Sequence, residues 1–148
     1  MDDKISWCLK QKKGIELVEP NENLCQAYFL DADDSLSTME DVKKKWKIIT
    51  GYYACYNALY ALLMKTGIKC EIHDCTLELM HFFDFEDEEK TFLKNLKKLR
   101  IGVQYYLEPA TEINSSKIKS FVTHCKVLNK SLEEDKIKEL RMELAKND

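Results

Sequence analysis

Glycine and proline are scarce in this sequence of 148 residues, which contains four glycines and two prolines. The turns of a β protein draw heavily on these two residue types, so a sheet-rich fold is disfavoured. Segments with the apolar spacing of helices fill the chain instead, and no repeat, low-complexity segment or linker divides it. The sequence therefore predicts one all-α domain over residues 1–148, with a core at about 43–128 and a charged C-terminal helix at 131–148.

The sequence has no excess of positive charge, and we expect neither a leader peptide nor a disulfide framework. The net charge is −3, which excludes a global basic signal for nucleic acid. The N-terminal stretch "MDDKISWC" opens with acids and lacks the apolar core of a signal peptide. The six cysteines lie mostly in apolar runs without the short regular spacing of a disulfide scaffold. We therefore expect free thiols and a cytoplasmic location.

The longest run without charge is "IITGYYACYNALYALLM", residues 48–64. Its 17 residues lie at the lower limit for crossing a bilayer, and Asn57 and four tyrosines dilute its apolar character. This pattern predicts a buried central helix and no membrane association.

Helical spacing and end signals predict seven helices. The expected ranges are 2–18, 22–35, 41–65, 74–83, a fifth helix that begins in the acidic stretch 84–89 and ends before Pro109, 114–128 and 131–144. Gly67 is the expected C-terminal cap of the third helix. Ser131 and Glu134 have capping-box spacing at the start of the last helix, which is strongly charged and is expected to fray or to lie on the surface.

Asn57 is the one strongly polar residue inside the third helix. On a helical wheel it shares a face with Tyr53, Ala54, Ala61 and Met64. The alanines on this face permit close approach of another helix. Two interpretations follow: a core asparagine at a packing defect, or a contact with a ligand or a second subunit.

Arginine is much rarer than lysine in this sequence: only Arg100 and Arg141 occur among the 23 lysine and arginine residues. In the fifth helix a predicted core stripe consists of Phe92, Leu96, Leu99, Val103 and Tyr106. Arg100 lies at the border of this stripe, about 65° from its centre. Tyr105 and Ile101 point to the opposite side of the helix, which carries Lys90, Lys94, Lys97 and Lys98. A guanidinium there can hold a phosphate or a carboxylate with two hydrogen bonds, or it can extend over the core and pair with an acid.

The stretch "GYYACYNALYALLMKTGIKCEIHD" resembles the central helix of HEPN-domain proteins, and "LRIGVQYY" resembles the second landmark of that family, an arginine followed by histidine or tyrosine. The resemblance covers roughly residues 43–125. The matching positions of the first landmark are Tyr52, Tyr53, Ala54, Ala61, Leu62, Leu63, Gly67 and His73.

This resemblance implies an antiparallel bundle of four to five core helices plus short extra helices. It also implies a homodimer, often encoded beside a minimal nucleotidyltransferase as a toxin–antitoxin-like pair. In active members of the family an arginine and a histidine form a metal-independent ribonuclease site at the dimer interface. Arg100 matches the arginine, and Tyr105 or Tyr106 stands in place of the histidine.

The replacement of histidine weakens the case for catalysis. An unperturbed tyrosine has a pKa of about 10 and is a poor base at neutral pH, but it can donate a hydrogen bond or stack on a nucleobase. Arg100, Tyr105 and Tyr106 are therefore the candidate catalytic residues. Asn57, Tyr53 and Lys97 are the candidate contacts to nucleotide or RNA. His73 is expected to cap or pack near the start of the fourth helix.

Other chemistry has weaker signals. Cys70, His73 and Cys75 offer three zinc-ligand types, with His81 a conceivable fourth, but no second paired-cysteine unit follows. Helix-packing thiols explain them better. The run "DADD" at 31–34 lacks the glycine and distal glutamate of a calcium loop and is expected to be a solvated helix end. No glycine-rich phosphate loop occurs. We therefore expect no metal and no cofactor.

Two function classes remain. The first is contact with nucleotide or RNA, extending to metal-independent RNA cleavage in which Arg100 stabilises the developing charge. The second is a catalytically silent dimeric interaction module that binds a partner protein such as a nucleotidyltransferase.

Overall fold

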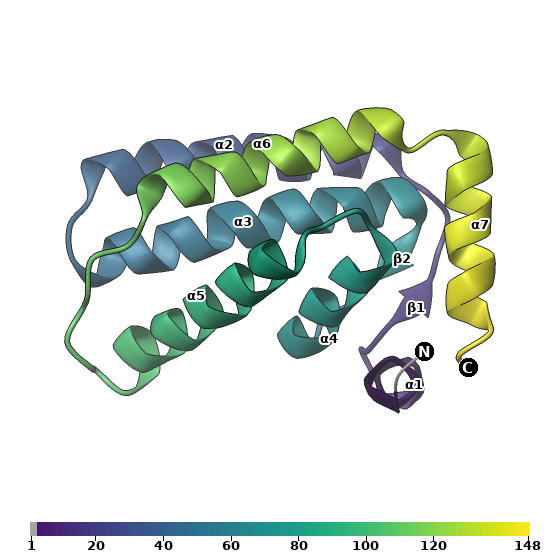
Figure 1. Ribbon diagram of the computed structural model, residues 1–148, viewed down its shortest axis with the longest axis horizontal. Coiled ribbons are helices and arrows are strands. Elements are labelled where there is room, and N and C mark those ends of the chain that lie inside the picture. The colour runs from purple at the N-terminus through teal and green to yellow at the C-terminus, as the bar shows by residue number, and fades with distance from the viewer. Residues whose placement is uncertain (1–2) are drawn as a thin grey trace.

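The computed structural model of the chain describes residues 3–148, which form an all-α helical bundle with one very short sheet (Figure 1). In chain order the elements are α1 (Asp3–Lys10), β1 (Glu16–Leu17), α2 (Glu22–Asp41), α3 (Lys45–Thr66), β2 (Ile68–Lys69), α4 (His73–Glu78), the 3-10 helix η1 (Leu79–Phe82), α5 (Asp87–Tyr105), α6 (Ser115–Ser131) and α7 (Glu134–Ala145).

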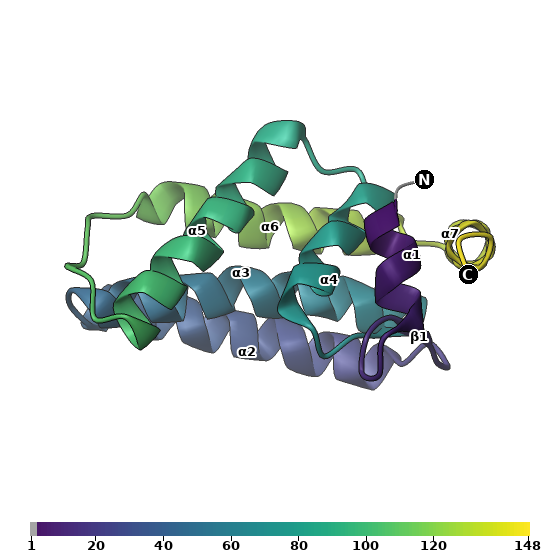
Figure 2. The same ribbon diagram turned by 90° about the horizontal axis from the view of Figure 1, so that it is seen from below.

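Helix α3 is the centre of the bundle, as its uncharged sequence predicts. Helices α2, α5 and α6 all pack against it (Figures 1 and 2). Most of its residues are buried, which explains why it is apolar nearly all round. Gly67 ends it in the left-handed conformation with φ 82°, and the predicted cap is confirmed. Across residues 3–148, none of the helices combines the length and apolar character that a bilayer crossing requires.

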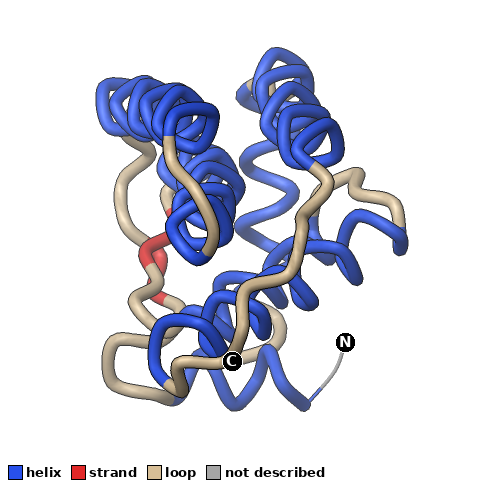
Figure 3. Tube along the Cα trace, turned by 90° about the vertical axis from the view of Figure 1, so that its left-hand side faces the viewer, coloured by secondary structure: helices blue, strands red, loops and turns tan. Residues whose placement is uncertain are grey.

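The N-terminal segment differs from its prediction as a helix over 2–18. Its expected start at Asp2 lies outside the described residues, and α1 ends at Lys10. The chain then turns back, with the Ile15 amide donating to the Cys8 carbonyl at 3.0 Å, and β1 pairs antiparallel with β2. Figure 3 shows this sheet as a short red segment beside the helices. The predicted helix stops early because Glu16 and Leu17, within the predicted range, pair with Lys69 and Ile68 instead. The spacing of residues within 2–18 cannot reveal partners that lie so far along the chain.

Two other predicted boundaries shift in the same region of the chain. Helix α2 continues to Asp41, so the acidic run at 31–34 lies inside a helix and not at a helix end. Its three aspartates are nevertheless solvated, while Ala32 between them is buried against the core. Helix α3 consequently begins at Lys45 and not near Asp41.

The helix caps are partly those expected. Acidic residues begin α5, where Glu86 and Glu89 form a capping box. The box predicted at Ser131 and Glu134 is wrong. Ser131 is the last residue of α6 and its hydroxyl donates to the Leu128 carbonyl, so it is not free to cap α7.

Helix α7 lies across one end of the bundle (Figure 1) and is held there firmly. Leu140 and Leu144 are buried. The Arg141 guanidinium donates from Nη1 to the carbonyls of Val18 (2.8 Å), Thr66 (3.1 Å) and Gly67 (2.8 Å). The last helix is thus exposed on one side, as predicted, but docked on the other.

The expectation that all six cysteines are free is wrong, because Cys8 of α1 and Cys75 of α4 form a disulfide. The two Cα atoms lie 5.8 Å apart across 67 residues of sequence. Cys25, Cys55, Cys70 and Cys125 are free and buried. Burial raises the pKa of Cys25 to about 11 and raises the pKa of the other three thiols as well. These four thiols are packing groups and not nucleophiles.

Candidate functional site

Helix α5 presents a different face to the core from the one predicted. The buried residues are Leu93, Leu96, Arg100, Gly102 and Val103. Leu99 is 37% exposed and Tyr106 is 74% exposed, so neither belongs to the core stripe. The true stripe is rotated toward Arg100, because the tyrosines of α3 accommodate its guanidinium. The arginine expected at the border is therefore at the centre of the packed face.

Arg100 is 5% exposed and is surrounded by aromatic rings. Its Cζ atom lies 4.7 Å from the ring centre of Tyr52, 5.6 Å from that of Tyr53 and 5.7 Å from that of Tyr105. The negative faces of such rings attract a cation, at about 0.5–2 kcal/mol each. We call Arg100 and these three tyrosines the arginine cluster.

Arg100 lacks the acidic partner that a structural arginine would be expected to have. Its hydrogen-bond partners among the described residues are neutral: Gln104 Oε1 accepts from Nη1 at 3.3 Å, and the Tyr52 side chain also accepts from the guanidinium. Its Nε is buried without an acceptor, and within residues 3–148 no carboxylate forms an ion pair with the guanidinium. Burying a charge costs several kcal/mol unless it is paired. The arginine cluster is therefore a cationic position whose counter-charge is not supplied by the fold.

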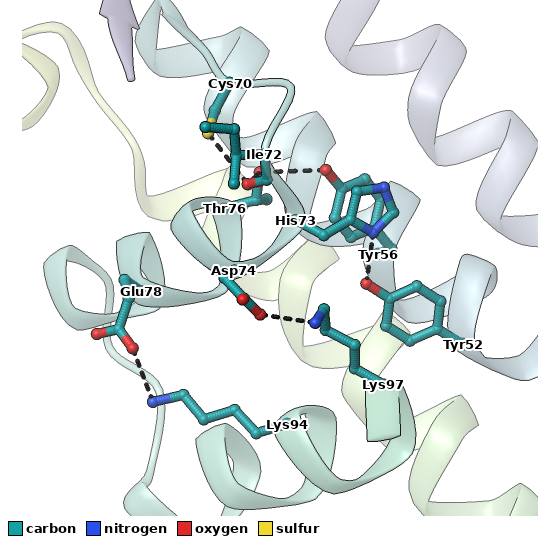
Figure 4. A network of polar contacts seen from close by, with 10 residues as sticks. All are labelled: Tyr52, Tyr56, Cys70, Ile72, His73, Asp74, Thr76, Glu78, Lys94 and Lys97. Atoms are coloured by element: carbon teal, nitrogen blue, oxygen red, sulfur yellow. Dashed lines mark hydrogen bonds and ion pairs between the residues drawn. The ribbon is translucent and has the colours of Figure 1, made fainter. Parts of the chain in front are cut away.

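His73, the first residue of α4, lies beside the arginine cluster (Figure 4). Its Nδ1 is 2.8 Å from the Tyr52 hydroxyl oxygen, and its ring stacks on Tyr56 at 4.1 Å between ring centres. The predicted packing role of His73 is confirmed, whereas Ile72 is the N-cap residue and makes no side-chain capping bond.

Burial lowers the pKa of His73, and the positive charges of Arg100 and Lys97 act in the same direction. Burial raises the pKa of Tyr52, outweighing the opposite effect of Arg100. At neutral pH the pair is consequently a neutral imidazole and a protonated phenol. A neutral imidazole can accept a proton, so His73 is a residue beside the arginine cluster that is able to take part in acid–base chemistry.

Lys97 is not free to bind an anion in the way the sequence suggested. Its Nζ lies 2.6 Å from Asp74 Oδ1, and its side chain is only 15% exposed (Figure 4). The bond to Lys97 is the main reason why the pKa of Asp74 is lowered. The neighbouring pair Lys94–Glu78 repeats this link between α5 and α4 at 3.1 Å. Both lysines tie α4 to α5 and so fix the position of His73.

The remaining candidates divide into those near Arg100 and those away from it. Tyr53 and Tyr105 belong to the arginine cluster, and Tyr105 is 64% exposed and forms its outer wall. No interaction between described residues joins Tyr106 or Asn57 to Arg100. Asn57 is half-buried one turn beyond Tyr53, and Tyr106 points into solvent as the C-terminal cap of α5.

Sequence reasoning missed that Tyr52 belongs to the arginine cluster and that His73 lies beside it. The available signals were the density of aromatic residues in "GYYACY", with Tyr52, Tyr53 and Tyr56 close together on α3, and the places of Tyr52 and His73 among the positions that match the first HEPN landmark. Nothing in the sequence marks which helix brings a histidine to them.

The zinc ligand types noted at Cys70, His73 and Cys75 do not form a metal site in this fold. Cys75 is bonded to Cys8, so it cannot serve as a thiolate ligand. Within residues 3–148, no three side chains of histidine, cysteine, aspartate or glutamate gather in a metal-binding arrangement.

Comparison of the chain with protein-family models, with curated proteins and with solved structures found no match in any of the three. The resemblance to HEPN-domain proteins therefore stays a prediction that rests on the two sequence landmarks.

Proposed function

We propose that the chain binds a phosphate-bearing ligand, a nucleotide or an RNA, at the arginine cluster. The observation that carries this proposal is the buried guanidinium of Arg100, which has no acid partner and has an unsatisfied Nε. A phosphate would supply the missing negative charge, and its oxygens would accept hydrogen bonds from the free N–H groups of the planar guanidinium. Tyr105, exposed at the outer wall, would stack on a base or donate a hydrogen bond to the ligand.

The same proposal includes RNA cleavage without a metal ion. Arg100 would stabilise the charge that develops on the phosphate during attack by the ribose 2′-hydroxyl. His73 supports this extension because its imidazole, which is neutral at neutral pH, lies against Tyr52 of the arginine cluster, at 2.8 Å between Nδ1 and the hydroxyl oxygen. The setting would be a homodimeric HEPN-like protein paired with a nucleotidyltransferase in a toxin–antitoxin-like system.

A cytoplasmic location belongs to this proposal too. The Cys8–Cys75 disulfide counts against it, because disulfides persist mainly in oxidising compartments. Because Cys8 and Cys75 are fully buried, fresh cell extract is denatured in the presence of an alkylating reagent before any oxidation. Alkylation of both residues supports the cytoplasm, and a protected disulfide opposes it.

The silent interaction module is the second candidate, and the end of α5 favours it. Tyr105, Tyr106 and Leu107 are 64%, 74% and 75% exposed, which is unusual for three consecutive large apolar or aromatic side chains. Arg100 is also almost covered, with Tyr105 among the side chains around it, so a ligand would have little access to the guanidinium in the conformation described. A second copy of the chain or a nucleotidyltransferase would cover this surface.

One experiment separates the two functions. Wild type, Arg100→Gln and a Tyr106→Ser, Leu107→Ser double variant are incubated with a mixed RNA pool in EDTA, and RNA binding, cleavage and oligomeric state are measured together. Loss of binding or cleavage in Arg100→Gln with the oligomer unchanged supports the first function. If the wild type neither binds nor cleaves RNA, while the double variant loses its partner copy, the interaction module is the better description.

A further inference from the structure

A second cationic surface lies at the beginning of α3, around the sequence "VKKKWK" at 42–47. Four of these six residues are lysines, and Trp46 between them is 55% exposed. Lys45 Nζ lies 5.3 Å from the centre of the Trp46 ring. Within the described part of the chain, none of Lys43, Lys44, Lys45 and Lys47 takes part in an ion pair.

Two adjoining grooves lie on this surface, with volumes of about 460 Å³ and 530 Å³. They share Val42, Lys43, Lys44 and Ala110, so they form one continuous depression between the α2–α3 connection and the segment that follows α5. Lys47 lines the first groove, and Trp46 lines the second. We call this depression the lysine groove.

The acids of the lysine groove do not cancel its charge. Glu112 lines the first groove and Glu108 lines the second, one carboxylate against three lysines in each case. Glu40 nearby is paired with Lys119 at 2.6 Å. The groove is therefore cationic in a chain whose net charge is −3, so it would attract a polyanion locally.

We propose that the lysine groove binds the phosphate backbone of single-stranded RNA and guides the strand to the arginine cluster. Lysines contact phosphates without regard to sequence, and an exposed tryptophan gives a stacking platform for a base. This combination of a cationic groove with an aromatic side chain is the arrangement used for single strands. The proposal rests on the proposed function and specifies the ligand as a strand of several nucleotides and not a lone nucleotide.

The position of the groove fits this route. Lys45 and Tyr52 are seven residues apart on α3, which corresponds to about 10 Å along the helix axis. From Arg100, the chain passes Tyr105 and then Glu108, which lines the groove. Figures 1 and 2 show the α2–α3 connection and the α5–α6 connection at the same end of the bundle, opposite α7. A strand in the groove therefore reaches the exposed side of Tyr105 within a few nucleotides.

The test compares two variants that each remove four positive charges. The first replaces Lys43, Lys44, Lys45 and Lys47 with glutamine. The matched control replaces Lys130, Lys136, Lys138 and Lys146, which are exposed, form no ion pair among the described residues and lie at the opposite end of the bundle. The probe is a fluorescein-labelled oligouridylate of about twelve nucleotides, long enough to cover a groove of this kind. Its affinity is measured from roughly 50 to 200 mM salt.

If all four lysines contact phosphate, the slope of log K against log salt becomes shallower by about 2.8 in the first variant, at about 0.7 per contact. Over this fourfold salt range, wild-type binding then weakens about 50-fold more than binding by the variant. The control should keep the wild-type slope. Trp46→Leu should weaken the affinity at least about fivefold, and Trp46→Phe should retain most of it.

An unchanged slope in the first variant, or an equal loss in the control, would overturn the lysine groove as the binding surface. Binding of the wild type to phosphatidylserine vesicles but not to the oligonucleotide would overturn it in favour of a membrane contact. The two proposals fail separately. If Arg100→Gln binds the oligonucleotide like the wild type while the first lysine variant does not, the groove stands and the arginine cluster falls. The reverse result removes the groove alone.

Discussion

The two arginines of the chain should respond very differently to replacement by methionine, which keeps an unbranched apolar stem and removes the guanidinium and its charge. Arg141 donates to three backbone carbonyls where α7, β1 and the end of α3 meet. Arg100 donates only to the neutral side chains of Gln104 and Tyr52 and leaves its Nε without an acceptor. If Arg100 is a binding residue whose counter-charge comes from a ligand, its removal should cost the free protein little stability.

The magnitudes can be set from these contacts. A hydrogen bond to a charged group contributes about 1.5–3 kcal/mol, so Arg141→Met should lower the free energy of unfolding by roughly 3 kcal/mol or more. Arg100→Met loses three ring contacts of about 1 kcal/mol each. It also relieves the desolvation of an unpaired charge, several kcal/mol, and the unsatisfied Nε, about 1–3 kcal/mol. We therefore expect Arg100→Met to change stability by no more than about 1 kcal/mol, or to raise it.

Urea unfolding followed by far-ultraviolet circular dichroism measures both variants against the wild type. With a slope of about 2 kcal/mol per molar urea, Arg141→Met should lower the midpoint by about 1.5 M, and Arg100→Met should leave it within about 0.5 M of the wild type. A loss in Arg100→Met as large as that in Arg141→Met would refute the reasoning. It would show that the tyrosines fully compensate the buried charge and that Arg100 is a structural residue.

Three further outcomes follow from the fold. Reduction of the Cys8–Cys75 disulfide should lower the free energy of unfolding by about 4 kcal/mol through loop entropy in the unfolded chain, and Cys8→Ser should lose the same amount and no longer respond to reductant. The pKa of His73 is lowered on folding, so its contribution to stability is complete above about pH 6.5, the value in the unfolded chain, and is lost as the pH falls below it. The urea midpoint of His73→Gln should therefore decrease less than that of the wild type as the pH is lowered, and an equal decrease would contradict the assignment. Gly67→Ala should destabilise by about 2 kcal/mol or more, because the left-handed backbone disfavours a side chain and a Cβ would press on the Val18 carbonyl; a thermal midpoint equal to that of the wild type would be inconsistent with this close approach.

The predictions that the structure confirms are those that depend on one segment at a time. The uncharged run 48–64 predicted the central helix α3, because a helix that is apolar on all sides must have neighbours on all sides. Gly67 predicted its end for a local reason too, since the left-handed cap favours glycine. The acidic start of α5 was likewise readable, and Glu86 and Glu89 are its capping box.

The predictions that failed depend on two distant segments. The early end of α1 follows from the pairing of β1 with β2, and each of these strands has two residues, too few for an alternating pattern. The disulfide joins Cys8 to Cys75 because α1 packs beside α4. Neither spacing nor composition carries this information. The false capping box at Ser131 arose because α6 continues three residues beyond its predicted end.

Arg100 shows how local and distant information combine. Its rarity in a lysine-rich chain was enough to select it, but the helical wheel assigned a charged residue to the border of the apolar stripe. That assignment assumes that a charge avoids the core, and the assumption fails where aromatic rings replace water around the cation. The rings come from α3 and from the end of α5, and His73 comes from α4, held by the pair Lys97–Asp74. An arrangement built from three helices can be proposed from one of its residues, but the histidine that lies beside Arg100 and its tyrosines becomes visible only when the helices are packed.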